Sequence, residues 1–345
     1  MIRGLKVDGK RELLAKGLYW SGASFLLSQL PARDSLLVLN YHRIGNPDDD
    51  LFDPGVFSAT ADQFNEQVSY LKNHVSLVTL DEALAFIEGT NKEKNRRCRV
   101  LITFDDGYLD NYEIAYPVLS AQGAQGVFFL ATSMVGSCEA PWWDHIAYLV
   151  KTARRRRFQL RYPMDLTVNL DEKGLAESLR AILRHYKLPE NSDPARFIRE
   201  LEEESKGEAL PRTQRRFLNW DEAREMSKGG MAMGSHTHSH TVLSQLSTDQ
   251  QREELTKSRT ILKEQLGVEV DVLAYPVGGK TSFTYETQTL AREAGFRAGF
   301  SFYGGTNLPG KTLPYDVKRI GIDDQSRSRF RVQTAVCSFT GSYWP

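Results

Sequence analysis

Two adjacent carboxylates and a group of histidines supply the residue types of a metal centre. Asp105 and Asp106 end the run "RVLITFDDG", and His236, His238 and His240 lie in "AMGSHTHSH". Four residues of extended strand span about 13 Å, whereas one helical turn brings residues i and i+4 to roughly 6 Å. We therefore expect a turn at the strand's end to bring His236 and His240 onto one ion, with His238 pointing elsewhere. Two imidazoles and one carboxylate are the protein ligands of an open catalytic site; an incidental group of exposed histidines is the alternative.

The two carboxylates repel each other, so their adjacency needs a reason. Neighbouring strand residues face opposite ways, and Gly107 permits a sharp turn directly after the strand. One carboxylate can bind a cation, which lowers its pKa and offsets the repulsion, while the other stays free as a base toward water. A surface Asp-Asp-Gly turn is the common alternative. It does not explain why such a turn directly ends an apolar strand.

The elements around these residues favour an α/β fold. Short apolar or β-branched runs alternate with helical patterns, which is typical of βα units around a mainly parallel sheet or barrel. The expected strands are 36–42, 75–80, 99–104, 126–132, 230–236, 271–276, 298–302 and 317–322. The expected helices are 60–74, 79–89, 111–123, 247–267 and 284–295. Active sites of such folds collect at the C-terminal ends of strands, where the carboxylates, the histidine group and His42 stand.

Residues 138–218 break this alternation, because long charged helical patterns replace the short apolar runs. We expect a helical insertion there, inside a domain of residues 35–345 that follows an N-terminal helical segment of residues 1–34. The run "ARRRR" is interpreted as a solvated helix end rather than a site for an anionic partner, since no aromatic stacking pattern accompanies it.

Composition narrows the classes of partner. Lys plus Arg and Asp plus Glu both number 44, so no global field favours nucleic acid. The three cysteines have no paired spacing, which argues against a disulfide framework or a thiolate metal site. None of these patterns defines an oligomeric state.

The N-terminal stretch "GLYWSGASFLLSQL" lacks a secretory pattern, so we expect a protein of the cytoplasm or its membrane face. The stretch is interpreted as a helix packed on the domain. The alternative is a helix in peripheral contact with a membrane surface. Its apolar side would then consist of Leu18, Tyr19, Trp20, Phe25, Leu26, Leu27 and Leu30.

The motifs "TFDDG", "SHTHSH" with "LSQL", and "AYPVG" resemble those of the NodB-like polysaccharide deacetylases of carbohydrate esterase family four. The segments "YHRIG", "WWD", "NWDE" and "KRIGI" are similar to a bacterial branch in which the strand bearing the general-acid histidine stands at the N-terminus. The resemblance covers about residues 36–325. It implies a distorted α/β barrel with fewer than eight strands, a divalent metal ion, and hydrolysis of an N-acetyl group on an amino sugar.

The resemblance also implies roles for individual residues. Asp105 matches the family's general base, and Asp106, His236 and His240 match its metal triad. The backbone N–H of Val277, in the motif "AYPVG", matches a donor to the oxyanion. Imidazole and carboxylate suit zinc, cobalt and nickel, and zinc is the metal that we expect.

Two departures from the family pattern concern the helper residues. The family commonly has an arginine where this chain has Ala274, and we expect Arg319 to orient the base instead, with a structural surface arginine as the alternative. No histidine follows His240, so the general acid must come from elsewhere. His42, which ends a strand of the same kind, is the expected acid, unless it is a core histidine bonded to backbone. His145 after "WWD" is a weaker choice.

Several aromatic residues could contact a sugar. Trp142, Trp143 and Trp220 are candidate platforms for sugar rings, with core packing as the alternative for each. The adjacent pair Trp142 and Trp143 cannot both point inward easily, so one of them is expected to line the cleft. Tyr275 is included among the candidate substrate contacts although a structural role is favoured for it, and Tyr41 is expected in the core.

The sequence therefore predicts a metal-dependent deacetylase that acts on N-acetylated amino sugars in a poly- or oligosaccharide and releases acetate. One alternative is an amide hydrolase for a formyl or acyl group of a lipid-linked sugar, which the N-terminal apolar helix would suit. The other is a non-catalytic carbohydrate-binding relative. Such a relative should lack a metal ligand or the base, and this chain has all four residues.

Overall fold

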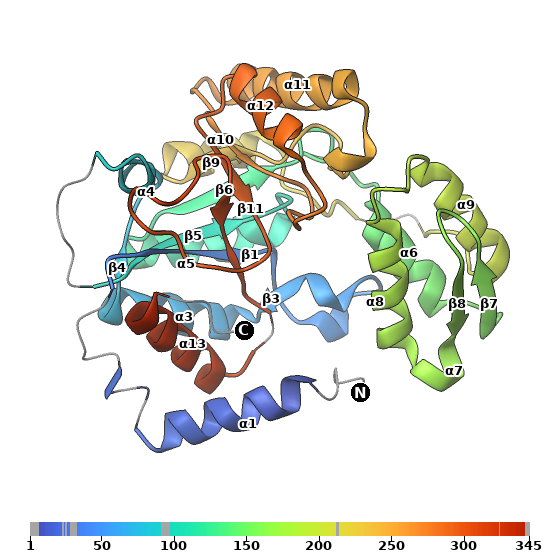
Figure 1. Ribbon diagram of the computed structural model, residues 1–345, viewed down its shortest axis with the longest axis horizontal. Helices are drawn as coiled ribbons and strands as arrows, with labels where there is room; N and C mark the ends of the chain where they lie inside the picture. Colours follow the sequence, from blue (N-terminus) through green and yellow to red (C-terminus); the bar gives the residue numbers. More distant parts are fainter. Residues whose placement is uncertain are drawn as a thin grey trace.

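A mainly parallel sheet forms the centre of the protein (Figure 1). The computed structural model describes residues 7–22, 24, 26–27, 33–90, 97–211, 214–323 and 325–341. Within these residues the central sheet has nine strands in the order β12-β11-β10-β9-β6-β5-β1-β13, with β4 beside β5. The strands are β1 (Leu36–Tyr41), β4 (Ser76–Leu77), β5 (Arg99–Phe104), β6 (Gly126–Leu130), β9 (Ala232–Ser235), β10 (Val272–Ala274), β11 (Ala298–Ser301), β12 (Val317–Lys318) and β13 (Ile320–Gly321).

One interrupted strand links the two ends of this sheet. β12 pairs with β11, where Ser301 faces Lys318, and β13 pairs with β1, where Leu39 faces Ile320. Only Arg319 separates the two short strands, so the chain passes from one edge of the sheet to the other within a few residues. The sheet is thereby nearly closed. The predicted distorted barrel is confirmed: with β12 and β13 counted as one interrupted strand, the ring has seven strands, and β4 pairs only with β5 within the described residues. The expected strand 317–322 is two half-strands.

Helices cover the outside of the sheet, and their ends follow the sequence signals. Thr79 caps α4 and forms a capping box with Glu82, as the pattern "TLDE" predicts. Gly123 and Gly267 end α5 and α11 in the left-handed conformation. These helices are α3 (Ala61–His74), α4 (Leu80–Ile87), the π-helical η3 (Asn111–Ala115) with α5 (Tyr116–Gln122), α10 (Trp220–Lys228), α11 (Thr248–Leu266), α12 (Tyr285–Glu293) and α13 (Arg327–Thr340). The short elements between them are β2 (Arg43–Ile44), η1 (Pro47–Asp49), η2 (Pro54–Val56), β3 (Phe57–Ala59) and η4 (Leu243–Gln245).

The insertion lies beside the barrel and has a hydrophobic cluster of its own (Figure 1). It contains α6 (Trp142–Lys151), β7 (Arg157–Leu160), β8 (Leu166–Asn169), α7 (Leu170–Lys173), α8 (Leu175–Tyr186) and α9 (Pro194–Ser205). The insertion contains helices, as expected, and also an antiparallel pair of strands, β7 and β8, that was not predicted. The sequence signal for this pair was the alternation of polar and apolar residues in "RFQL", which are alternately exposed and buried in β7. The domain boundaries themselves stay a prediction.

At the N-terminus, α1 (Val7–Trp20) packs against α13, where the hydroxyl of Tyr19 accepts a hydrogen bond of 3.2 Å from Arg331. Other apolar side chains of residues 7–27 are exposed to solvent: Leu13 is 71% exposed, Trp20 81% and Leu26 66%. Phe25 and Leu30, which were predicted to share that apolar side, lie outside the described residues. No helix in the described ranges is both long enough and apolar enough to span a membrane.

Candidate active site

Three potential metal ligands meet at the C-terminal edge of the sheet. Asp106 follows β5, while His236 and His240 follow β9, and all three side chains are buried. The Nε2 atoms of His240 and His236 lie 3.2 and 3.5 Å from Oδ1 of Asp106. One ligand atom from each residue lies within 4.8 Å of the others. The structure therefore brings together the three residues that the sequence predicts as a triad.

The chemistry of these donors fits a divalent cation. Nδ1 of His236 lies 2.8 Å from the carbonyl oxygen of Ala274, which can only accept a hydrogen bond, so Nε2 keeps its lone pair. Burial lowers the pKa of His236 to about 4, which keeps this imidazole neutral near pH 7. Oδ1 of Asp106 is buried without a hydrogen-bond partner. A bound cation would satisfy this oxygen and the two imidazoles together. These donors suit several divalent metals, so zinc stays a prediction.

The turn between the two histidine ligands is not helical, contrary to the expectation from their spacing. Residues 236–240 form a loop after β9. Glu254 of α11 holds this loop, because its carboxylate accepts hydrogen bonds from the backbone N–H groups of His238 and the following residue, at 2.9 and 2.8 Å. The His238 ring lies 2.8 Å from the hydroxyl of Thr132 and points away from the triad, as predicted. Glu254 is a positioning residue that the sequence reasoning missed.

An uncommon backbone conformation is concentrated at this site. Five non-glycine residues in the described part of the chain have positive φ, and four of these belong to the site. The four are Asp106, Thr237, His240 and Val277. Gly107 also has positive φ, and a Cβ atom there would stand 2.7 Å from Leu130. Residues in this conformation are strained and cluster at functional sites.

Asp105 lies beside the triad, with its Oδ2 3.8 Å from Nε2 of His236, and an arginine holds it there. Both carboxylate oxygens of Asp105 accept hydrogen bonds from Arg319, at 2.7 and 2.9 Å, and Asn40 adds a third at 3.0 Å. Burial opposes the ionisation of Asp105, but the Arg319 guanidinium and the nearby imidazoles hold its pKa well below the usual range. Arg319 is fully buried and reaches the site because it stands at the break between β12 and β13. Asp105 is therefore an ionised and oriented carboxylate.

Asn40 is a second residue that the sequence reasoning missed. It is fully buried in β1, and its Oδ1 accepts hydrogen bonds from Arg319 at 2.7 Å and from Thr103 at 2.8 Å. The amide thus links the base, the arginine and the neighbouring strand. An amide inside the apolar run "LLVLNY" was the available signal, since buried polar groups need partners.

His42 directly follows β1, next to these groups. Its Nε2 atom lies 3.9 Å from Oδ2 of Asp105, and its ring lies 5.6 Å from that of Phe302. The side chain is 23% exposed, so it faces the open side of the site. Tyr41 points the other way into the core, where its hydroxyl donates to Gln67, as the strand alternation predicts.

The loop after β10 presents a free backbone donor. Val277 has φ of 63°, a strained value for a β-branched residue. Its N–H donates no hydrogen bond within the described residues. The carbonyl of Gly278 accepts from the N–H of Phe302 at 2.7 Å, which ties this loop to the end of β11. Val277 is therefore available to a ligand, as its predicted role requires.

The tryptophans of the insertion contact the triad unequally. Trp143 is buried, its ring lies edge-on 4.6 Å from that of His240, and its Nε1 donates to the hydroxyl of Tyr108 at 2.8 Å. Trp142 is half-buried, lies 6.3 Å from His240, and stacks on Tyr186 at 4.2 Å. Trp142 is thus at the rim, and Trp143 packs against the ring of His240.

The other candidate residues lie elsewhere. Tyr275 is fully buried, stacks on Phe283, and donates to the carbonyl of Tyr315, so it offers no surface to a substrate. The prediction that Tyr275 contacts the substrate is wrong, because its ring is part of the core. Trp220 packs against the main core cluster. His145 is an α6 residue whose ring lies 3.2 Å from Glu202 of α9.

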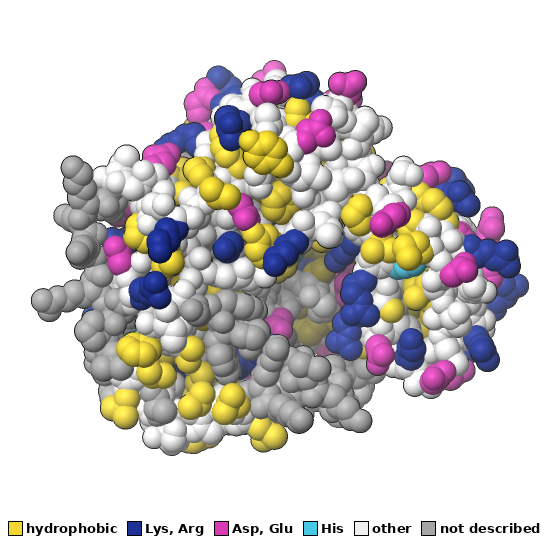
Figure 2. Space-filling view, viewed as in Figure 1, with side chains coloured by type: hydrophobic (Ala, Val, Ile, Leu, Met, Phe, Trp, Pro, Cys, Tyr) yellow, Lys and Arg dark blue, Asp and Glu magenta, His cyan; other side chains and the backbone are white. Residues whose placement is uncertain are grey.

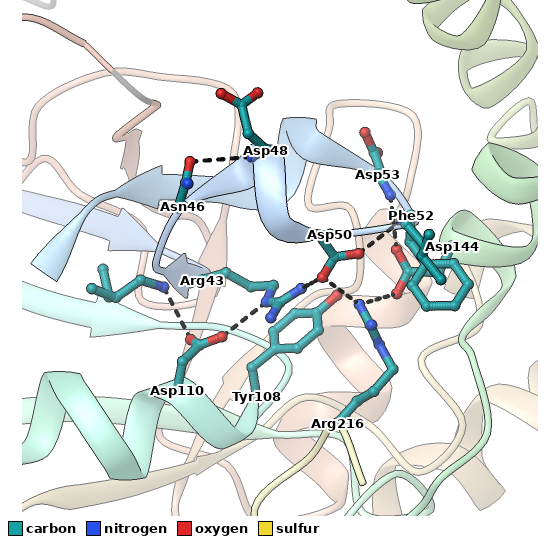
Figure 3. A network of polar contacts seen from close by, with 12 residues as sticks. Arg43, Asn46, Asp48, Asp50, Phe52, Asp53, Tyr108, Asp110, Asp144 and Arg216 are labelled. Carbon is teal, nitrogen blue, oxygen red and sulfur yellow. Dashed lines mark hydrogen bonds and ion pairs between the residues drawn. The ribbon is translucent and has the colours of Figure 1, made fainter. Parts of the chain in front are cut away.

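A network of buried charges connects the segment after His42 to the insertion (Figure 3). Arg43 donates to Asp110 at 2.8 Å and also pairs with Asp50. Arg216 lies 3.4 Å from Asp50 and 2.9 Å from Asp144 of α6. Figure 3 shows these side chains converging from the β2 segment, the start of the helix that follows β5, α6, and the loop before α10. The network therefore fixes the insertion, with its two tryptophans, against the mouth of the barrel.

A nearly closed parallel sheet with buried carboxylates and imidazoles at its C-terminal edge defines an α/β barrel with a candidate metal site. The chain belongs to the polysaccharide deacetylase family, which matches residues 92–299. It is 20% identical over 277 residues to the putative polysaccharide deacetylase YxkH of Bacillus subtilis, covering 80% of this chain and 67% of that protein. It is 33% identical over 115 residues to a poly-beta-1,6-N-acetyl-D-glucosamine N-deacetylase of Staphylococcus epidermidis, covering 30% of this chain and 39% of that one.

Solved structures share the fold. The deacetylase PplD of Streptococcus pyogenes has a TM-score of 0.56 and 19% identity, with 87% of this chain and 98% of that chain covered. IcaB of Ammonifex degensii has a TM-score of 0.56 and 22% identity, with 88% and 97% covered. These likenesses agree with the distorted α/β barrel derived from the strand order.

Proposed function

We propose that this protein hydrolyses N-acetyl groups of amino sugars in a poly- or oligosaccharide and releases acetate, with a divalent metal ion as cofactor. The observation that carries the proposal is the division of labour between adjacent carboxylates. Asp106 faces two imidazoles with an unsatisfied oxygen, while both oxygens of the neighbouring Asp105 accept hydrogen bonds from Arg319, although one of them lies 3.8 Å from His236. Family membership and the partial match to a poly-beta-1,6-N-acetyl-D-glucosamine N-deacetylase support this substrate class.

The residues have distinct roles in the proposed reaction. Asp106, His236 and His240 would hold the cation, which when bound supplies Lewis-acid polarisation of the acetyl carbonyl and a more acidic water. Asp105 accepts a proton from the attacking water. His42, on the open side of the site, donates a proton to the departing amine.

The N–H of Val277 would stabilise the oxyanion that develops on the acetyl carbonyl. The backbone of Val277 is held in a strained conformation, and its N–H has no partner among the described residues. Such a donor is already in place and needs no rearrangement when negative charge develops on the carbonyl oxygen. This role combines the family resemblance with the local geometry.

The test is to measure bound metal in the purified protein and acetate release from N-acetylglucosamine oligomers with and without a chelator. We expect about one cation per chain and activity that is lost with the chelator and restored by metal. Asp105→Asn is the matched variant, because it should retain metal and lose turnover. A metal-loaded protein that releases no acetate from any N-acetylated oligomer would contradict the proposal.

A specific surface feature favours a second proposal, peripheral membrane contact and a lipid-linked sugar substrate. Leu13, Trp20 and Leu26 expose apolar surface on one N-terminal segment. Exposed tryptophan and leucine on a helix are typical of residues that enter the membrane interface. The chain would then act at the membrane face of the cytoplasm.

Sedimentation with lipid vesicles tests membrane contact. The double variant Leu13→Ser/Trp20→Ser should remain in solution if the wild type sediments, while Leu313→Ser, which removes a side chain that is 64% exposed on the barrel, should behave as wild type. Equal sedimentation of all three proteins would reject this proposal.

A further inference from the structure

Lys187 is an unpaired cation at the rim of the candidate site. It follows α8, and its ammonium lies 5.7 Å from the centre of the Trp142 ring. The side chain is half-buried, yet it makes neither an ion pair nor a side-chain hydrogen bond within the described residues. By contrast, the nearby Lys151 donates to the carbonyl oxygens of Leu51 and Phe52. Lys151 is therefore a structural lysine, and Lys187 is not.

The surroundings place Lys187 close to the chemistry. Trp142, over which it lies, is 6.3 Å from the ring of His240. Burial lowers the pKa of Lys187, while Asp53 and Asp106 act against this shift, so the ammonium is within electrostatic range of a proposed metal ligand. Asp53 does not pair with it and instead accepts a hydrogen bond of 2.8 Å from the N–H of Gly55. Figure 2 shows a hollow between the barrel and the insertion, with Lys and Arg side chains along its insertion side.

Two hydrogen-bond donors at this rim have no partner within the described residues. The Nε1 atom of Trp142 is buried without a hydrogen-bond partner, and the ammonium of Lys187 has three donors. The ammonium is partly desolvated and has no protein acceptor within the described residues, so acceptors on a ligand would complete its hydrogen bonds. Neutral hydroxyls could do this weakly, but charge-assisted bonds to a carboxylate or a phosphate are shorter and roughly twice as strong.

We propose that Lys187, beside Trp142, forms a subsite for an anionic group, a carboxylate or a phosphate, carried by the glycan next to the N-acetylated sugar. This inference rests on the proposed deacetylase function, because it names the class of glycan that the site prefers. It assigns substrate selection to the insertion rather than to the barrel. Both sources of negative charge satisfy the same chemistry, and the test separates them.

The test compares three series of N-acetylglucosamine oligomers of equal length: neutral, carboxylated and phosphorylated. The variants are Lys187→Met, which keeps the apolar stem, and Lys187→Arg, which keeps the charge. Arg184→Gln is the matched control, because it removes a charge from an exposed position in the last turn of the same helix. Metal content and melting temperature of each variant show that the barrel is intact.

We expect the wild type to prefer at least one anionic series, through a lower KM, by about tenfold or more, as charge-assisted hydrogen bonds typically give. Lys187→Met should abolish this preference and leave kcat/KM for neutral oligomers within about twofold. Lys187→Arg and Arg184→Gln should keep the preference, which should weaken with added salt. The anionic series that responds identifies the group.

Equilibrium binding of the same oligomers separates this inference from the proposed function. If the metal-loaded wild type releases no acetate but binds anionic oligomers more tightly than Lys187→Met does, the subsite stands and the deacetylase proposal fails. Equal binding of neutral and anionic oligomers by the wild type overturns the subsite. The subsite is also overturned if Lys187→Met weakens the binding of neutral and anionic oligomers equally, because the lysine would then only support the Trp142 ring.

Discussion

Replacing Arg319 by methionine should destabilise the protein strongly, because it leaves a buried carboxylate without its counter-charge. Arg319 is fully buried and donates to both oxygens of Asp105, to Asn40 at 2.7 Å and to the carbonyl of Ser301 at 3.1 Å. Removing one partner of a buried ion pair typically costs about 3–5 kcal/mol. The Asp105 carboxylate accepts two hydrogen bonds from Arg319 and one from Asn40, so after the substitution only the bond from Asn40 would remain. We therefore expect the free energy of unfolding to fall by about 3–5 kcal/mol.

A double-mutant cycle isolates the Arg319–Asp105 pair. Arg319→Met and Asp105→Asn each leave one buried charge uncompensated, whereas the double variant leaves neither. The double variant should therefore lose less stability than the sum of the two single variants, with a coupling of about 2 kcal/mol or more. Urea unfolding of the metal-free proteins, followed by circular dichroism, measures the three values, and an unchanged m-value shows comparable unfolding.

The exposed Arg297 is the control for a general effect of losing arginine. It pairs with Glu88 and Asp271, and Arg297→Met should cost about 0–1 kcal/mol because such pairs are screened by solvent. If Arg319→Met costs no more than this control, or if the two single effects simply add, then Arg319 does not hold the base in the way that the structure indicates.

The same pair determines how the protein responds to acid. Because the folded-state pKa of Asp105 lies below its ordinary value, its contribution to stability is present above that ordinary value and is lost as pH falls through the folded pKa. Without Arg319 the folded pKa rises, so the contribution disappears at higher pH. Arg319→Met should therefore unfold at higher pH than wild type in an acid titration followed by tryptophan fluorescence.

Three further outcomes test the site and its support. His42→Ala should cut turnover by about 100- to 10,000-fold and leave metal content unchanged, and loss of metal would reject its role as the acid. Asp106→Ala and His240→Ala should lose the metal itself, measured by elemental analysis, and an inactive variant that keeps a full complement would contradict the triad. Burial raises the pKa of Asp144 from its ordinary 3.8 to about 7, although Arg216 opposes this shift, so its contribution to stability is complete below pH 4 and is lost as pH rises through 7. Asp144→Asn should flatten the decline in melting temperature between about pH 4 and 7, and an unchanged slope would assign that decline to other groups.

The sequence predicts the bounds of a strand well where the strand lies inside the sheet, between two neighbouring strands. The expected strand 99–104 agrees with β5 (Arg99–Phe104), because apolar residues on both faces make a buried parallel strand recognisable. The expected strand 317–322 is instead interrupted, and neither half lies between two strands along its whole length. Its two halves pair with opposite edges of the sheet, and the break at Arg319 depends on closure of the barrel, which no local periodicity contains.

The proposed ligands could be predicted from spacing and chemistry, but their supports could not. Asn40 and Arg319 are 279 residues apart in the chain, and their contact exists only because β1 and β13 are neighbours. Arg216 and Asp144 are 72 residues apart and meet only when the insertion folds back onto the barrel. Long-range pairs of this kind follow from topology, whereas a motif reports only residues that are close in sequence.

The backbone at the site shows why local rules fail there. A non-glycine residue in the left-handed region costs roughly 1–2 kcal/mol, and the aspartate at 106 is among the residue types that tolerate it best. Glycine at position 106 or 240 would relieve this strain, but it would remove a carboxylate or an imidazole that the triad needs. Val277 has no such side-chain role, and its strain is explained if the orientation of its N–H is what the site requires. The chain therefore departs from the most stable local choice at the positions where the proposed chemistry needs a particular group. The hydrogen bonds of Glu254 and the buried ones of Arg319 offset the cost.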